Sequence, residues 1–251
     1  GTVTPKPQKG NPKPRIFRNV NEMSILNRLG FNNKGVDYLV KNLKKRNTDI
    51  IVGSSIGKNF DTPIEKASED YIYCLERVYK YSDYIAINIS SPNTEKLRDL
   101  SKVEHFDYLL KIIKSKQDDL SVLFGYRPIF IKISPDESCE DLNNICNSIL
   151  KNKIDGIICS NTTTDHTDPK GLGGISGRPL KKKATDTLIQ VRNLLGDNLP
   201  IIASGGVMSS KDYLEKIDAG ANLVQLYTGF IFEGPKLIDD IVNLDSKVRN
   251  T

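Results

Sequence analysis

The chain of 251 residues contains no tryptophan, two histidines, two methionines and four cysteines. The cysteines form no CxxC pair, and no histidine lies near them at the spacing of metal ligands, so no metal site is expected. We interpret them as thiols in a reducing compartment. His105 and His166 lie away from other clusters of catalytic residue types. A catalytic triad built on histidine is therefore not expected.

The sequence also lacks any run of about 18 apolar residues, so no membrane-spanning helix is predicted. The net charge of +5 is spread over many residues, with short basic runs at 44–46 and 181–183. Such runs are typical of solvated helix faces, and we expect no nucleic-acid binding. With 38% hydrophobic residues, the chain can bury the core of one barrel-sized domain over residues 1–251, although two small domains would also fit.

Apolar runs rich in Ile and Val alternate along the chain with amphipathic stretches. The runs are continuous, which is typical of strands that are covered on both faces. The predicted strands are 49–55, 83–89, 128–134, 155–160, 200–204 and 223–228. The predicted helices are 63–81, 103–116, 140–152, 184–195, 211–219 and 236–248. Repeated strand-then-helix units predict parallel strands with right-handed crossovers.

Residues 1–4 resemble the end of a further strand, which makes seven strands in all. An open doubly wound sheet would tolerate seven strands, but it would place its ligand at one crevice. Here polar residues follow nearly every strand, as in barrels that collect active-site groups from many strand ends. The predicted fold is therefore an α/β protein, a (β/α)8 TIM barrel whose first strand is missing from this chain.

Residues 88–94 place two amides and three hydroxyls directly after the apolar run 83–87. Pro and Asn are ordinary turn residues, so a plain turn is an alternative. The repetition of such clusters at other strands favours a site for a small polar molecule. Lys132 lies inside the apolar run 129–133, where a charge indicates an anion or a reacting group nearby.

Glycines follow the last two predicted strands, at 205–206 and at 229. Barrels commonly hold a phosphate on backbone N–H groups at this position, although two ordinary turns remain possible. A phosphate cradle, a buried cation and a neutral polar pocket together point to FMN. Reduction makes the flavin ring anionic, so the ring would be stabilised by a positive charge beside N1 and O2.

Seven strings, in order over the whole chain, resemble class 2 dihydroorotate dehydrogenase. They are GTVTP (1–5), NRLGFNN (27–33), IGKN (56–59), NISSPNT (88–94), SNTT (160–163), GGISG (173–177) and YTGF (227–230). Class 1 enzymes of this family have a cysteine base where this chain has Ser91, so the resemblance is to class 2.

The resemblance implies roles for individual residues. Ser91 would take the proton from C5 of dihydroorotate while hydride leaves C6 for N5 of FMN, with Thr94 assisting a weakly basic serine and Lys132 placed beside the flavin. The substrate-binding residues would be Asn27, Arg28, Leu29, Gly30, Phe31, Asn88, Asn93, Asn161 and Thr162. The FMN-binding residues would be Thr2, Ser55, Asn88, Lys132, Ser160, Gly177, Gly206, Tyr227 and Thr228.

The chain departs from the family pattern in three places. Ser55 stands where asparagine is frequent, which puts one flavin contact in doubt. The Ala-Gly segment and the substrate-binding lysine that follow the family's first strand are not in this chain. The connection at 165–170 is shorter than usual in the family.

For the whole protein, the resemblance implies pyrimidine synthesis with electrons passed to a membrane quinone. We expect a monomer that associates peripherally with the bacterial cytoplasmic membrane or the mitochondrial inner membrane. A missing N-terminal segment, formed by the first barrel strand and an amphipathic helical pair, would make this contact. The alternatives are a class 1 enzyme or another FMN barrel with a soluble electron acceptor, and a non-redox phosphate-binding barrel that would bind no flavin.

Overall fold

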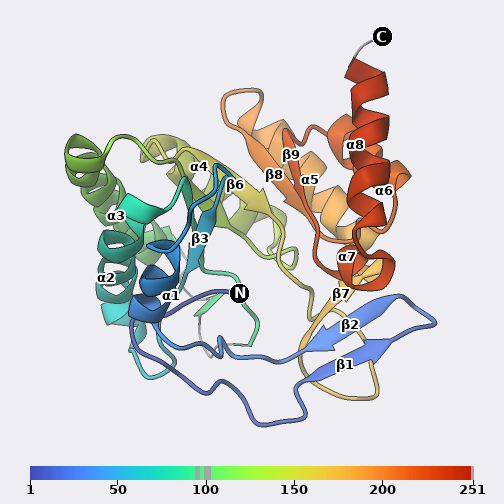
Figure 1. Cartoon of the computed structure of the whole chain (residues 1–251), viewed down its shortest axis with the longest axis horizontal. Coiled ribbons are helices and arrows are strands. Elements are labelled where there is room, and N and C mark those ends of the chain that lie inside the picture. The colour runs from blue at the N-terminus through green and yellow to red at the C-terminus, as the bar shows by residue number, and fades with distance from the viewer. Residues whose placement is uncertain (94–96, 99–102, 250–251) are drawn as a thin grey trace.

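The computed structural model describes residues 1–93, 97–98 and 103–249. Its centre is a curved sheet of six parallel strands (Figure 1). In spatial order the strands are β3 (Gly53–Ile56), β4 (Tyr84–Asn88), β5 (Ile129–Lys132), β6 (Gly156–Cys159), β8 (Ile201–Ser204) and β9 (Leu223–Gln225). Val3 adds a parallel bridge to Ile56 beside β3. The six predicted strands and the strand-like start of the chain are thereby confirmed.

Helices cover the outside of the sheet, and all of them except α1 (Val36–Leu43) were predicted from the amphipathic stretches (Figure 1). The others are α2 (Ala67–Val78), α3 (Val103–Phe124), α4 (Cys139–Lys151), α5 (Lys181–Leu195), α6 (Ser210–Asp218) and α8 (Lys236–Arg249). The short helix α7 (Thr228–Glu233) packs instead against β7 (Gly174–Gly177) and α8. Serine side chains define two of the helix starts, because Ser138 accepts a hydrogen bond from Asp141 N and Ser209 accepts one from Asp212 N. Single 3₁₀ turns, Ile64–Lys66 and Tyr79–Tyr81, extend α2 to nearly the predicted range.

The two faces of the parallel sheet bury two separate sets of apolar side chains. Toward the helices, alternate residues such as Ile87, Ile131 and Ile157 are completely buried in the main core. Toward the inside of the curve, Ala86, Phe130, Ile158 and Ile202 form a smaller cluster. Side chains alternate between the faces of a strand, so strands covered on both sides lose the alternating polar pattern.

A second, antiparallel sheet was not predicted. It consists of β1 (Ile16–Asn19), β2 (Ser24–Asn27) and β7 (Gly174–Gly177), with β2 in the middle. Figure 1 shows this sheet below the carboxyl ends of the parallel strands. Its strands have four residues each, and β1 is exposed at alternate positions, so neither length nor hydrophobicity marks it in the sequence.

Two predicted strand bounds need correction, and two helices were not predicted. The predicted strand 49–55 corresponds to β3, which begins at Gly53; Ile50 and Ile51 lie outside it and are exposed. The predicted strand 223–228 corresponds to β9, which ends at Gln225 because α7 begins at Thr228. The sequence analysis predicted neither α7 nor α1.

The basic run at 181–183 is only partly a solvated face. Lys181 Nζ lies 2.6 Å from both Asp212 Oδ1 and Glu215 Oε2. Lys183 Nζ lies 2.8 Å from Asp136 Oδ1. These two lysines join α5 to neighbouring elements, whereas Lys182 points into solvent and is 87% exposed.

No helix within the described ranges is long and apolar enough to cross a membrane.

We expect the fold to be least tolerant of smaller side chains at the buried positions of the central strands. Ile131 is completely buried on β5, opposite Ile87 of β4 and Ile157 of β6. We expect Ile131→Ala to lower the free energy of unfolding by about 2–5 kcal/mol, because it leaves a cavity in a packed core. Urea denaturation measures this loss. Val122→Ala on α3, where the side chain is 85% exposed, is the matched control and should change it by less than about 0.5 kcal/mol.

Candidate functional site

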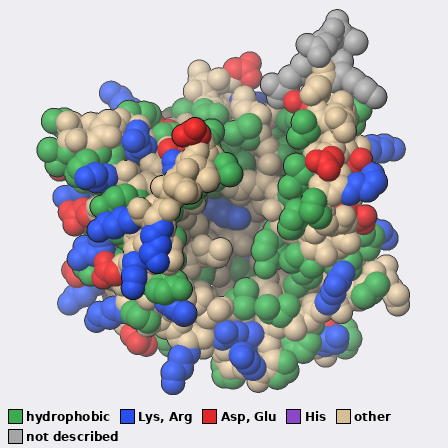
Figure 2. Space-filling view, in the orientation of Figure 1, with side chains coloured by type: hydrophobic (Ala, Val, Ile, Leu, Met, Phe, Trp, Pro, Cys, Tyr) green, Lys and Arg blue, Asp and Glu red, His purple; other side chains and the backbone are tan. Residues whose placement is uncertain are grey.

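A cavity of about 750 Å³ lies at the carboxyl ends of the parallel strands. Its walls include residues of all three antiparallel strands, which close it from the side opposite the parallel sheet. Figure 2 shows a hollow in the middle of this face of the molecule. Active-site groups of barrels occupy this end of the fold, so the cavity is the natural candidate site.

The floor of the cavity follows directly from the alternation along the strands. Asn88, Lys132, Ser160 and Ser204 lie two residues beyond Ala86, Phe130, Ile158 and Ile202, respectively. They therefore point to the same inner face, one layer closer to the carboxyl ends. Apolar side chains fill the inside of the curve below, and this polar layer lines the cavity above them.

Amide groups link the start of the chain to the loops after β4 and β6. Asn88 Nδ2 donates to Thr2 Oγ1 at 2.9 Å, and the Thr2 and Ser55 hydroxyls are also 2.9 Å apart. Asn161 Nδ2 donates to Asn88 Oδ1 at 3.3 Å, and its Oδ1 accepts from Thr162 N at 2.8 Å. These contacts hold several neutral donors and acceptors in fixed directions, which suits a ligand recognised by its hydrogen-bonding pattern.

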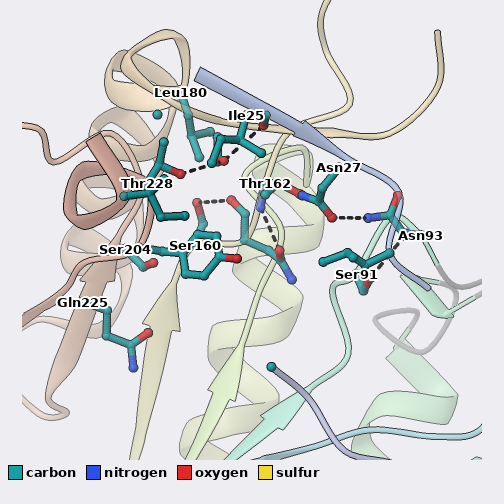
Figure 3. A pocket seen from close by; sticks show the side chains of 18 of the residues that line it. Ile25, Asn27, Ser91, Asn93, Ser160, Thr162, Leu180, Ser204, Gln225 and Thr228 are labelled. Carbon is teal, nitrogen blue, oxygen red and sulfur yellow. Dashed lines mark hydrogen bonds between the residues drawn. The ribbon is translucent and has the colours of Figure 1, made fainter. Parts of the chain in front are cut away.

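A second amide pair lies near Ser91 (Figure 3). Asn93 Nδ2 donates to Asn27 Oδ1 at 3.0 Å, while Asn27 Nδ2 donates to Gly174 O at 3.2 Å. Ser91 Oγ accepts from Asn93 N at 3.3 Å. Ser91 is buried and lines the cavity. Its hydroxyl is therefore held beside the amide cluster.

The charge in the cavity is positive. Among the described lining residues the charged side chains are Arg18 and Lys132, and none is a carboxylate or an imidazole. Lys132 makes no hydrogen bond or ion pair to any described residue. Its side chain is half-buried at the end of β5, and its partial removal from water lowers its pKa to about 8. A partly desolvated cation without a partner is costly, so the site is suited to a ligand that brings negative charge.

Thr162 supplies a second group that lacks a partner. Its Oγ1 is buried and forms no hydrogen bond within the described part of the chain. Buried hydroxyls are rarely left in this state, which points to a polar ligand atom near Thr162.

The opposite wall is built on close backbone contacts. Gly206 has a φ of +76°, and a Cβ there would lie 2.2 Å from Lys181 Cα. Gly177 has a φ of +89°, and a Cβ there would lie 2.2 Å from Met23 O. Only glycine fits both positions. Next to Gly177, Thr228 Oγ1 donates to Ser176 Oγ at 2.8 Å, on the side of the cavity away from Ser91 (Figure 3).

The structure brings nearly all of the predicted site residues together. Those that line the cavity are Thr2, Asn27, Leu29, Gly30, Phe31, Ser55, Asn88, Ser91, Asn93, Lys132, Ser160, Asn161, Thr162, Gly177, Gly206, Tyr227 and Thr228.

Two predicted residues are not placed in the cavity. The Arg28 side chain turns away from it, donating to Pro14 O and Lys170 O and lying 5.1 Å from the centre of the Phe17 ring. Thr94 lies outside the described residues.

Several lining residues were missed by the sequence reasoning. Gln225 and Ser204 are polar residues at the ends of apolar runs, the same signal that singled out Lys132. Ser176 lies within the string GGISG, but it was given no role. Arg18 and Ile25 come from the unpredicted hairpin, and nothing in their local pattern distinguishes them.

Comparison with known proteins agrees with this geometry. The family model described as dihydroorotate dehydrogenase matches residues 1–246. A protein of Aliivibrio salmonicida named dihydroorotate dehydrogenase (quinone) is 53% identical over 250 residues, which are 97% of this chain and 74% of that protein. A Vibrio cholerae protein of the same name is 50% identical over 249 residues, 96% of this chain and 74% of its own.

Solved structures show the same relationship. The crystal structure of DHODH from Eimeria tenella in complex with ferulenol superposes with a TM-score of 0.90 at 34% identity. It covers 97% of this chain and 72% of that one. The ligand-free DHODH of the same organism gives a TM-score of 0.90 at 36% identity, covering 97% and 74%. The fold is thus that of a (β/α)8 barrel, seen here as a curved sheet with its helices, and the chain belongs to the dihydroorotate dehydrogenase family of oxidoreductases.

Proposed function

We propose that this chain, acting as one FMN-binding barrel domain, oxidises dihydroorotate to orotate in pyrimidine synthesis. The observation that carries the proposal is the cavity itself, which is lined by an unpaired, half-buried cation, a set of fixed neutral amides and the Ser91 hydroxyl. Dihydroorotate carries one carboxylate and ring amides, and FMN carries a phosphate. Both ligands match a cavity whose described charges are positive.

FMN suits the inner floor and the glycine-lined wall. Lys132 would hold its ring, with Thr2, Ser55, Asn88 and Ser160 beside it. Gly177, Gly206, Tyr227 and Thr228 would receive its phosphate, since the glycines allow close approach to backbone N–H groups. When bound, FMN supplies the hydride acceptor that no protein side chain offers.

Dihydroorotate suits the amide cluster around Ser91. Asn27, Asn88, Asn93 and Asn161 would pair with its carboxylate and ring amides, Thr162 Oγ1 would gain the partner it lacks, and Leu29, Gly30 and Phe31 would close the pocket. Arg28 would act indirectly, by bracing the backbone that carries Asn27.

Ser91 is the proposed base that takes the proton from C5. This role is the one that the family resemblance implies for Ser91, and the described lining residues include no carboxylate or imidazole that would compete for it. As Ser91 Oγ takes the C5 proton, its own hydroxyl proton would pass to Thr94 and a water path. Asn93 N donates to Ser91 Oγ, so this contact stabilises the negative charge that the oxygen gains as its own proton leaves. A cysteine at this position would mark class 1, and Ser91 therefore supports class 2.

The proposed electron acceptor is a membrane quinone, in keeping with the quinone-dependent relatives. We further propose that the protein works as a monomer attached peripherally to a membrane.

The role of Ser91 can be tested by removing its hydroxyl. Ser91→Ala should keep bound FMN but slow flavin reduction by dihydroorotate by roughly 10²–10⁴-fold, the usual effect of losing a general base. Anaerobic stopped-flow absorbance measures the rate. Ser90→Ala is the control, because the Ser90 hydroxyl contacts Asn88 and Asn161 but does not line the cavity; it should slow the reaction less than about tenfold. An unchanged rate in Ser91→Ala would exclude the base role.

The partial burial of Lys132, which lowers its pKa, predicts a pH dependence of stability in the FMN-free protein. Its pKa falls from 10.5 to about 8 on folding. Between these pH values the unfolded chain binds more protons, so the free energy of unfolding should rise with pH. Lys132→Met removes this contribution. The stability gained by the substitution should be on the order of 1–3 kcal/mol at pH 7 and should shrink toward pH 10.

Urea denaturation of both proteins at several pH values measures this difference. Lys182→Met is the matched control, because Lys182 is largely exposed, and it should show no such trend. A pH-independent difference for Lys132→Met would mean that the amine is solvated in the folded protein.

The acceptor is tested by turnover with different oxidants. Purified protein should oxidise dihydroorotate with a short-chain ubiquinone under anaerobic conditions, and fumarate or NAD in separate reactions should support little turnover. Activity with fumarate or NAD but none with quinone would contradict the class 2 proposal, whatever the residue at position 91.

A further inference from the structure

The Arg98 guanidinium joins three loops at the carboxyl ends of β4, β5 and β6. Nε donates to Ser90 O at 3.4 Å, in the loop that carries Ser91. Nη1 donates to Asp136 Oδ2 at 3.0 Å, in the loop after β5. Nη2 donates to Thr162 O at 3.3 Å, in the loop after β6. One side chain thus ties the backbone next to the proposed base to the backbone of the amide cluster.

Asp136 is a fixed anchor for this arrangement. Its carboxylate also accepts hydrogen bonds from the Thr163 hydroxyl and from Thr164 N, and Lys183 Nζ lies 2.8 Å from Oδ1. Burial raises the pKa of Asp136, but the bonds from Lys183, Thr163 and Thr164 N outweigh it and hold the pKa well below its usual range. The carboxylate is therefore held in its charged form at neutral pH.

Arg98 itself is not among the residues that line the cavity. It lies behind the wall, with its side chain 27% exposed, so it has no direct contact with a ligand there. Its acceptors include two backbone carbonyls, in the loops after β4 and β6 on either side of β5, and the Thr164 hydroxyl also accepts from Nη1 at 3.4 Å. A planar guanidinium has several donors in fixed directions for such a set of acceptors, whereas a lysine amine is a single point charge.

We propose that Arg98 is a positioning residue for the reaction at Ser91, an inference that rests on the proposed function. By holding Ser90 O and Thr162 O to one rigid group, Arg98 sets the distance between the Ser91 hydroxyl and the Asn161–Thr162 segment, which would hold the substrate. A displacement of about 1 Å between reacting groups can slow a reaction about 10²-fold.

The test compares flavin reduction in wild-type holoenzyme, Arg98→Ala and Arg98→Lys. At saturating dihydroorotate, Arg98→Ala should slow the reaction by roughly 10–100-fold. The dissociation constant of orotate should change by less than about threefold, because the groups that would contact the ligand are all kept. Arg98→Lys should be nearly as slow, since it restores the charge beside Asp136 but not the contacts to both carbonyls.

Two further measurements distinguish positioning by Arg98 from a general role in maintaining the fold. Arg77→Ala is the matched control, because Arg77 makes an ion pair with Asp37 on the outer helices at 3.1 Å, and it should reduce flavin at the wild-type rate. Added guanidinium at low, non-denaturing concentration should partly restore Arg98→Ala relative to equal sodium chloride, and it should not accelerate Arg77→Ala.

The outcomes distinguish the positioning role of Arg98 from the proposed oxidation of dihydroorotate. A wild-type rate in Arg98→Ala, or full activity in Arg98→Lys, would overturn the positioning role while leaving the proposed function intact. Loss of FMN together with activity, without rescue by guanidinium, would also overturn it, because Arg98 would then only maintain the fold. Failure of the wild-type holoenzyme to reduce its flavin with dihydroorotate would instead overturn the proposed function.

Discussion

The alternation of side chains along parallel strands is the constraint on which the rest of the structure depends. Each central strand is covered on both faces, so one set of residues packs on the helices and the other fills the inside of the curve. At the carboxyl ends the inner set changes from apolar to polar, from Phe130 to Lys132 and from Ile158 to Ser160. This single change of residue type creates the floor of the cavity without altering the strands.

That arrangement combines a rigid support with polar groups that have no hydrogen-bond or ionic partner among the described residues. Ile131, completely buried, holds the β5 backbone in place next to Lys132, whose amine has no described partner. Thr162 Oγ1 is likewise buried without a hydrogen bond. Such groups lower the stability of the ligand-free protein and are compensated when a polar, anionic ligand binds. Because both groups line the cavity next to the satisfied amide network, they support placing the ligands there.

Much of this could be predicted from the sequence because the parallel strands are marked twice, by apolar runs and by the polar residues that end them. The positions of Asn88, Lys132 and Ser160 follow from that pattern alone. The antiparallel sheet could not be predicted in this way, since its strands are short and β2 pairs with β7 about 150 residues later in the chain. Arg18 and Ile25 were missed with it. The bracing by Arg98 depends on three loops meeting in space, and no local pattern reports such a meeting.

The central claim is that the protein oxidises dihydroorotate in this cavity, using a bound flavin that Lys132 would help to hold. The most direct measurement is the visible absorbance spectrum of the purified protein during anaerobic titration with dihydroorotate. The account predicts the spectrum of bound oxidised flavin at the start, followed by bleaching as dihydroorotate is added, with orotate appearing in proportion to flavin. A protein that contains no flavin after reconstitution with FMN, or whose bound flavin stays oxidised in excess dihydroorotate, would contradict it.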